Sequence, residues 1–299
     1  MKKRIMQCMA VAVAAIALFS CEQDRPAYSG KNYLMFSDTI YYYPVQESNE
    51  VFQVPVSATE KADYDRTFGV EIIDKESNAI EGKHYSLLSN TVTIKAGEMS
   101  ASVDVEGVYD NIGIGDSLGF ALRLVIPEEE KWSLYGDEAK VVLQKSCPFD
   151  INNFTGYCMV TSTYFAEYIP NIKKRLIETE LDPEEKNTVI LKNLYYDGFD
   201  VKLRFSRKNI MEPKVEMDEQ TLTTTGEAFS TIYGDGKLQI SQPTVYTSYY
   251  SSCENFVMQY VTLSVYNKDG SLFGTVGSYA HLLEWISDAE AEELKDQGF

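Results

Sequence analysis

Short runs in which apolar and polar residues alternate constrain the fold of this chain more than any other feature of its sequence. The clearest run has five apolar residues at every second position: Leu118, Phe120, Leu122, Leu124 and Ile126. A period of two places successive side chains on opposite faces of a β-strand. Strands with one apolar face bury it by packing sheet against sheet. The alternation therefore predicts an all-β protein.

The alternating runs form two groups, and 299 residues fit two domains better than one small sandwich. Over residues 32–145, turn residues separate the runs at the intervals typical of a β-sandwich. The segment at 146–150 contains a proline and marks the domain boundary. Over residues 150–285, alternation resumes with glycine hairpins at 197–198, 234–236 and 268–270. This second group predicts an antiparallel β-barrel or a strongly curved sheet.

The first twenty residues have the layout of a secretory signal. Three basic residues (Lys2, Lys3 and Arg4) precede an apolar run at 6–19 that is too short to span a bilayer. The run ends in Leu-Phe-Ser-Cys, which resembles the bacterial lipobox. The resemblance implies cleavage before Cys21, lipidation of its thiol and a membrane as the protein's first partner.

Residues 21–31 follow as a lipidated tether that begins Cys-Glu-Gln-Asp. An acidic stretch directly after the lipidated cysteine resembles the surface-export signal of lipoproteins in Bacteroides-like bacteria. The resemblance assigns Glu22 and Asp24 to that signal. We therefore expect a lipid-anchored protein of the outer membrane that faces the cell exterior.

The charge of the chain is strongly negative, with 45 acidic and 27 basic residues and a net charge of −18. Such a surface repels phosphate backbones, so we expect no nucleic-acid partner. Outside the cytoplasm a disulfide is permitted, and Cys147, Cys158 and Cys253 remain once the signal is removed and Cys21 is lipidated. We consider a Cys158–Cys253 bridge if the first and late strands of the second domain are neighbours. Buried free thiols are the alternative.

Residues 79–98 resemble the Calx-beta type of immunoglobulin-like domain. The sequence runs Ala-Ile-Glu-Gly-Lys-His-Tyr at 79–85 and Thr-Val-Thr-Ile-Lys-Ala-Gly-Glu at 91–98. The family has a Gly-x-Asp-Tyr turn, a Thr-Val-x-Phe strand and a Gly-Glu turn at these places, and here His84 replaces the aspartate. The resemblance implies an immunoglobulin-like sandwich over 32–145. Its matched positions do not supply the six or more oxygens that calcium needs, so we assign no metal.

The second domain also carries a resemblance. It opens with Phe-Thr-Gly-Tyr at 154–157, has Asn-Leu-Tyr-Tyr-Asp-Gly at 193–198 and closes on a strand with a glycine hairpin. This order is similar to a C-terminal domain of unknown function in lipoproteins of Bacteroides and its relatives. The resemblance implies a location and a fold, but no activity and no cofactor.

Two segments have helical character. Residues 171–186 are charged throughout and contain Asp182-Pro183, which predicts a helical excursion between strands. Ser287 and Glu290 form a capping-box signature, which predicts a short acidic helix over 286–299.

The residues that enzymes use are sparse. His84 and His281, the two histidines, fall in different predicted domains. No Gly-x-Ser-x-Gly elbow, zinc-protease motif or Cys-x-x-Cys pair occurs. Acidic residues such as Asp197, Asp200 and Glu254 fall in turns, where a solvated surface is the ordinary interpretation. We therefore expect no catalytic residues and no enzyme activity.

Tyrosine is abundant, with 21 residues. An exposed ring stacks on sugar faces and is favoured at protein interfaces, although tyrosine is also a common strand residue with a buried side chain. Tyr249 and Tyr250 lie in a polar segment, and Tyr195 and Tyr196 form a second pair. We take these four as the candidate ligand-binding residues.

The favoured function is a noncatalytic surface lipoprotein that binds a glycan or an envelope protein, in adhesion or nutrient capture. The alternative is a lipocalin-like carrier that holds a small apolar ligand inside the C-terminal barrel. A glycan-active hydrolase with two carboxylates in a cleft is the third hypothesis.

Overall fold

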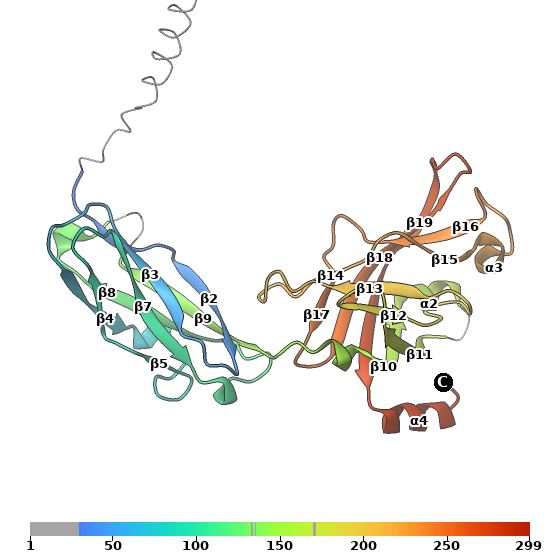
Figure 1. The fold of residues 1–299 in the computed structure, drawn as a ribbon, viewed down its shortest axis with the longest axis horizontal. Coiled ribbons are helices and arrows are strands. Elements are labelled where there is room, and N and C mark those ends of the chain that lie inside the picture. Colours follow the sequence, from blue (N-terminus) through green and yellow to red (C-terminus); the bar gives the residue numbers. More distant parts are fainter. Residues whose placement is uncertain (1–29, 133, 135, 170–171) are drawn as a thin grey trace, which may run out of the picture.

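The computed structural model describes residues 30–299 except 133, 135 and 170–171. Cys21, Glu22 and Asp24 lie outside the described residues, as does the signal segment at 1–20. The described chain forms two β domains that follow one another along the sequence (Figure 1). A short linker after β9 joins them.

The N-terminal domain is a sandwich of two sheets. Its elements are β1 (Leu34–Phe36), β2 (Ile40–Gln46), β3 (Phe52–Ala58), β4 (Arg66–Ile72), η1 (Asp74–Glu76), β5 (Tyr85–Leu87), β6 (Thr91–Ile94), β7 (Ser100–Gly107), η2 (Tyr109–Asn111), β8 (Leu118–Val125), η3 (Glu128–Glu130) and β9 (Glu138–Ser146). One sheet has the order β1-β3-β7-β5 and the other β2-β9-β8-β4-β6. The β2–β9 pair is parallel and the remaining pairs are antiparallel.

Alternation in the sequence explains the core between these sheets. Phe120, Leu122 and Leu124 of β8 are buried, whereas Arg123 and Val125 between and beyond them are exposed. Burying each such large apolar side chain contributes roughly 1.5–3 kcal/mol. The expected immunoglobulin-like β-sandwich is confirmed.

The turn that carries the Calx-beta resemblance lies against this core. Tyr85 is fully buried, and its ring stacks on Phe120 with centroids 3.7 Å apart. His84 is also buried, and its Nδ1 accepts a hydrogen bond from the Ile80 amide at 2.9 Å. Gly82 has a φ of +76°, a conformation that glycine adopts without strain. His84 therefore stabilises this turn.

The C-terminal domain is one large antiparallel sheet with three short helices. Its elements are η4 (Ile151–Phe154), β10 (Gly156–Ser162), α2 (Thr163–Tyr168), β11 (Lys174–Leu181), β12 (Thr188–Leu191), β13 (Val201–Phe205), β14 (Val215–Glu216), β15 (Gln220–Thr224), α3 (Thr225–Phe229), β16 (Lys237–Ser241), β17 (Tyr249–Ser251), β18 (Phe256–Tyr266), β19 (Leu272–Ile286) and α4 (Asp288–Asp296). The sheet order is β14-β13-β12-β11-β10-β19-β18-β16-β15, and β17 also pairs with β18.

One end of this sheet, strand β14, meets strand β17, which branches from β18. β17 lies on β18 at one side and contacts β14 at the other through a bridge between Lys214 and Tyr249. The Val215 amide donates to the Ser248 carbonyl at 3.1 Å, and the Tyr250 amide donates to the Pro213 carbonyl at 2.9 Å. The strands from β10 through β14, β17, β18 and β19 thus close into a strongly curved, barrel-like ring. The ring encloses an apolar core that includes Phe154, Phe165 and Phe205.

Within the segment predicted to be helical at 171–186, Lys174–Leu181 is instead strand β11, and that prediction was wrong. Ile177 and Thr179 face the core, while Glu178 and Glu180 point outward. The strand has only one apolar residue among its core-facing positions, so its period of two was hidden among charges.

The tail forms the expected helix α4, and the Ser287 hydroxyl accepts a hydrogen bond from the Glu290 amide at 3.3 Å.

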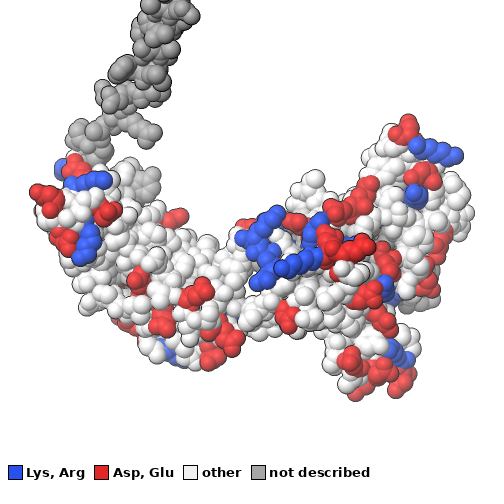
Figure 2. Space-filling model, in the orientation of Figure 1, with Lys and Arg blue, Asp and Glu red and all other residues white. Residues whose placement is uncertain are grey.

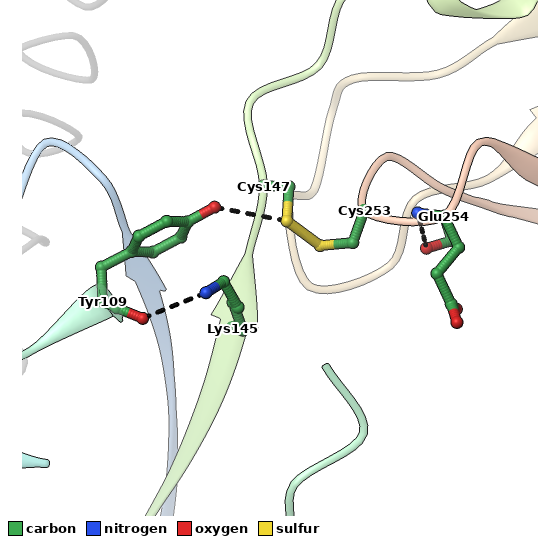
Figure 3. The surroundings of a disulfide bond; sticks show 6 residues. Tyr109, Lys145, Cys147, Cys253 and Glu254 are labelled. Atoms are coloured by element: carbon green, nitrogen blue, oxygen red, sulfur yellow. Dashed lines mark hydrogen bonds between the residues drawn. A yellow bond between two sulfur atoms is a disulfide. The ribbon is translucent and has the colours of Figure 1, made fainter. Parts of the chain in front are cut away.

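The Cys158–Cys253 bridge that we considered is not formed, because Cys147 pairs with Cys253 (Figure 3). Cys158 lies on β10 with its side chain in the core, fully buried and with its thiol free. Cys253 instead lies in the turn between β17 and β18, outside that core, where it meets the interdomain linker. The Tyr109 hydroxyl of the sandwich donates to Cys147 Sγ at 3.3 Å, so both domains contact the bridge.

We predict that a protein of residues 27–299 has no alkylatable thiol when native and one when denatured. Burial raises the pKa of the Cys158 thiol and shields it from reagent. Peptide mapping without reduction should recover Cys147 joined to Cys253. A peptide that joins Cys158 to Cys253 would contradict this assignment.

Candidate binding surface

Tyr249 and Tyr250 are neighbours in the sequence but lie on opposite faces of strand β17. Tyr249 is 41% exposed, whereas Tyr250 is 5% exposed. Successive side chains of a strand alternate between the two faces of a sheet. The predicted pair therefore supplies one exposed ring.

Tyr250 belongs to the core, so its expected role as an exposed ligand contact is corrected. Its ring packs edge-on against Phe154 and Phe205, with centroids 5.8 and 5.1 Å away. Its hydroxyl donates to the Ser206 carbonyl at 3.4 Å, and burial raises its pKa.

Tyr195 and Tyr196 lie elsewhere, and the structure does not bring them beside Tyr249 on one surface. Tyr195 is 1% exposed, and its hydroxyl hydrogen-bonds to the His281 imidazole inside the domain. Tyr196 is half-buried, and its hydroxyl lies 2.7 Å from that of Tyr164. The placement of Tyr195 as an exposed ligand contact is therefore wrong. Both rings stabilise the packing of α2 against the sheet.

His281 is fully enclosed on β19. Burial lowers the pKa of its imidazole to about 3, so the ring is neutral at physiological pH. The folded protein therefore binds fewer protons than the unfolded chain between about pH 3 and 6.5. The free energy of unfolding should fall as the pH drops below 6.5, and the loss should continue to about pH 3.

We predict that His281→Gln weakens this acid sensitivity, because the amide retains a hydrogen bond to Tyr195 but does not titrate. When the free energy of unfolding is plotted against pH, the slope for the wild type should exceed that for the variant by up to about 1.4 kcal/mol per pH unit. Urea unfolding across this pH range measures the difference. Parallel curves for the two proteins would show that His281 is not the titrating group.

The outer face of the sheet around β17 follows from the strand register. Tyr249 lies opposite Met258, which lies opposite Leu282. Phe256 is two residues from Met258 on the same face, and Tyr260 is two residues beyond it. Their neighbours Val257, Gln259 and Val261 point into the core.

Aromatic rings gather on this outer face. Tyr246, 56% exposed in the loop before β17, stacks on Tyr260 with centroids 5.2 Å apart. The rings of Tyr249 and Phe256 meet edge to face at 6.2 Å. We call these four residues with Met258 the aromatic face: Tyr246, Tyr249, Phe256, Met258 and Tyr260. Exposed apolar surface of this kind, carrying phenol hydroxyls, suits contact with sugar rings or with a protein.

Sequence reasoning selected only Tyr249 from this surface. The alternation of the run at 257–266 places Met258 and Tyr260 on one face, opposite Val261 and Leu263. The signal for that part of the surface was therefore present. The pairing of Tyr246 with Tyr260 depends on the loop before β17 folding over β18, which no local pattern reveals.

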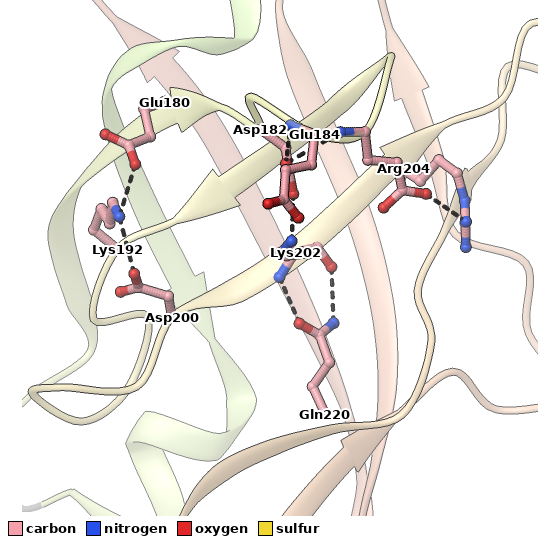
Figure 4. Close-up of polar contacts among 9 residues, drawn as sticks. Glu180, Asp182, Glu184, Lys192, Asp200, Lys202, Arg204 and Gln220 are labelled. Atoms are coloured by element: carbon pink, nitrogen blue, oxygen red, sulfur yellow. Dashed lines mark hydrogen bonds and ion pairs between the residues drawn. The ribbon is translucent and has the colours of Figure 1, made fainter.

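Carboxylates of the C-terminal domain are held in ion pairs on the outer side of β11, β12 and β13 (Figure 4). Lys192 Nζ lies 2.8 Å from Glu180 and 3.0 Å from Asp200. The carboxylate of Asp182 contacts the Lys202 ammonium, which lowers the pKa of Asp182. A general acid needs the opposite shift. These pairs brace neighbouring strands.

Asp197 and Trp285 each bind another residue of the same domain. Asp197 pairs with Arg175 at 2.8 Å. Trp285 donates from its indole nitrogen to Thr179 Oγ1 at 2.9 Å and packs edge-on against Phe154.

Among the described residues, no three His, Cys, Asp or Glu side chains are placed to hold a metal ion. No helix in the described ranges is long and apolar enough to cross a membrane.

The fold and the aromatic face define a two-domain all-β protein with an exposed aromatic surface. The chain belongs to the DUF4984 family, a domain of unknown function whose model matches residues 134–297, more than half of the chain. This match agrees with the expectation of a domain of unknown function in this part of the chain, and the bounds 150–285 stay a prediction. No curated protein matches the sequence.

Solved structures with related arrangements include a protein of unknown function from Bacteroides ovatus, with 8% identity and a TM-score of 0.35, over 85% of this chain and 94% of that one. An auxiliary nutrient binding protein from Bacteroides thetaiotaomicron has 14% identity and a TM-score of 0.30, over 89% and 92%. The apo-form Calx CBD1 domain has 17% identity and a TM-score of 0.32, over 39% and 98%. TM-scores this low assign neither a fold nor a ligand to this chain.

Proposed function

We propose that this protein is a noncatalytic binding protein whose aromatic face contacts a glycan. The exposed ring of Tyr246 stacked on the half-buried ring of Tyr260, continued by Tyr249 and Phe256, carries the proposal. Tyr249, Phe256 and Tyr260 lie on strands and Tyr246 is held by its stacking on Tyr260, so little side-chain entropy is lost when a flat sugar face stacks on these rings. Their hydroxyls supply hydrogen bonds at the rim.

The carrier and hydrolase hypotheses receive less support from the interior of the C-terminal domain. Aromatic and aliphatic side chains, including Phe154, Phe165 and Tyr195, fill the space in which a carrier would hold its ligand. His281 is neutral and enclosed, and the Cys158 thiol is buried. These positions suit a packed core better than a reaction centre.

The proposed location rests on the N-terminal sequence. We infer lipidation at Cys21, with Glu22 and Asp24 directing the protein to the exterior of the outer membrane. Two or more acyl chains on one cysteine give a lasting anchor. A short tether would then hold the sandwich between the membrane and the C-terminal domain, where the aromatic face lies.

We predict that Tyr246→Ala/Tyr249→Ala weakens binding of the recognised polysaccharide about tenfold or more. Each stacked ring contributes about 0.5–1.5 kcal/mol beyond its buried area. A glycan array of residues 27–299 identifies the polysaccharide, and calorimetry compares the variants. Tyr64→Ala is the matched control, because Tyr64 is a 64% exposed tyrosine on the other domain. Equal binding by the double variant and the wild type would exclude the aromatic face as the glycan site.

We predict that Cys21→Ala moves the protein out of the membrane fraction and abolishes labelling by radioactive palmitate. Glu22→Ala/Asp24→Ala should keep the label but protect the protein from protease added to whole cells. Persistent membrane attachment of Cys21→Ala would contradict the lipid anchor. Unchanged protease access in the acidic-pair variant would show that these carboxylates are not the export signal.

A further inference from the structure

A groove of about 780 Å³ lies where the C-terminal domain meets the linker and the sandwich. The linker contributes Cys147, Pro148 and Phe149, and β17 with its following turn contributes Tyr250 to Cys253. The loop between β13 and β14 forms another wall with Arg207 and Met211. The Cys147–Cys253 disulfide joins two of these walls, so it limits how far they separate. Binding sites often form at such domain junctions.

Arg207 is the group in this groove whose bonding is incomplete. Arg66, Arg123, Arg175 and Arg204 all donate hydrogen bonds to carbonyl, amide or carboxylate oxygens. Arg207 alone among the arginines of the described chain has neither a hydrogen bond nor a carboxylate partner. Its guanidinium lies over the Phe149 ring, 5.2 Å from the centroid, and its side chain is exposed. Stacking orients the guanidinium plane and leaves its N–H groups for a ligand.

Further bases surround Arg207 on a protein that is acidic overall. Figure 2 shows Lys and Arg side chains gathered over the loop between β13 and β14, which carries Arg207 and Lys208. Lys145 lines the groove from the linker side, and its ammonium lies over the Tyr109 ring and donates to the Tyr109 carbonyl.

Carboxylates also lie near these bases. Glu212 is already paired with Lys214 at 2.7 Å, and Glu47 lines the groove from the sandwich. Asp150 and Glu254 also lie close by, because they directly follow the groove residues Phe149 and Cys253. The charged residues that line the groove are Arg207, Lys145 and Glu47, and Arg207 is the one whose N–H groups are left for an anion.

The groove and the aromatic face share strand β17, whose Tyr250 lines the groove from the inner side and whose Tyr249 lies on the outer side. Tyr249 of the aromatic face directly precedes Tyr250 and Ser251, which line the groove. Across the bridge, Lys214 lies opposite Tyr249 and directly follows Pro213, another groove residue. One residue of a strand spans about 3.3 Å, so a chain of a few sugars reaches from one to the other.

We propose that the groove binds the carboxylate of a uronic acid in the glycan whose neighbouring sugars stack on the aromatic face. This inference rests on the proposed function. The Arg207 guanidinium presents paired N–H groups that match a carboxylate. The ammonium groups of Lys208 and Lys145 add positive charge but no planar pair of donors. The adjoining flat rings favour a polysaccharide over an acidic peptide. The substrate class is thus an acidic polysaccharide.

The test compares a polyuronate with its own uncharged form. Residues 27–299, which contain both cores, are titrated calorimetrically with polygalacturonate, with fully methyl-esterified polygalacturonate and with alginate. We expect at least one polyuronate to bind about tenfold more tightly than the ester, and added salt to weaken that preference. Arg207→Gln should abolish the preference yet keep the weaker binding of the ester. Arg207→Lys should restore only part of it, because lysine lacks the planar fork.

The control is Lys237→Gln, which removes an exposed lysine from β16 of the same domain and should leave all affinities unchanged. Circular dichroism verifies that each variant is folded. Equal affinity for polyuronate and ester, or an unchanged preference in Arg207→Gln, overturns the uronate site while leaving the proposed glycan binding intact. Absence of binding to every polysaccharide overturns both.

A peptide of consecutive glutamates tests the other source of carboxylates. Binding that matches the polyuronate, is lost in Arg207→Gln and is unaffected by Tyr246→Ala/Tyr249→Ala would assign the groove to an acidic peptide and overturn the proposal. Weak peptide binding beside tight polyuronate binding supports it.

Discussion

The contact between β14 and β17 closes the C-terminal sheet, and the arrangement of the candidate sites depends on it. Two backbone hydrogen bonds hold this contact, from Val215 to Ser248 and from Tyr250 to Pro213. Once β17 is fixed between β14 and β18, the alternation of the strand decides the rest. Tyr250 enters the core among Phe154 and Phe205, and Tyr249 remains outside.

The same strand connects the other features that bear on function. Its outer side continues into the rings of Phe256 and Tyr260 on β18, and its end leads into the turn that carries Cys253. The disulfide fixes that turn to the linker after the sandwich. The aromatic face and the groove with Arg207 are therefore built on one short segment, held by backbone bonds on two sides and by a covalent bond at its end.

The sequence was sufficient for the parts of the fold that local patterning determines. Alternation in β8 and β18 predicted strands and a sandwich, and Ser287 with Glu290 predicted the capped tail helix. It was insufficient where distant segments decide the outcome. β11 hides its alternation because charged residues occupy its outward positions, and one of them, Glu180, pairs with Lys192 directly after the next strand. The strand β17 looks like a polar loop until β14 pairs with it.

The candidate site was predicted only in part for the same reason. Tyr249 was selected, but Tyr250 and Tyr195 were selected with it, because composition does not distinguish an exposed tyrosine from one that closes a core. Cysteine pairing likewise depends on which way a side chain points. Cys158 lies on β10, which pairs with the late strand β19, so the condition for a Cys158–Cys253 bridge is met. Its side chain nevertheless faces the interior of the domain.

Hydroxyl-radical footprinting read by mass spectrometry tests most directly whether closure of the barrel-like ring places one tyrosine outside and its neighbour inside. Tyr246 and Tyr249 should be oxidised rapidly in the free protein, and Tyr250 and Tyr195 slowly. Bound polysaccharide should then protect Tyr246 and Tyr249. Oxidation of Tyr250 as fast as that of Tyr249, or a bound glycan that leaves both outer rings unprotected, would contradict the account.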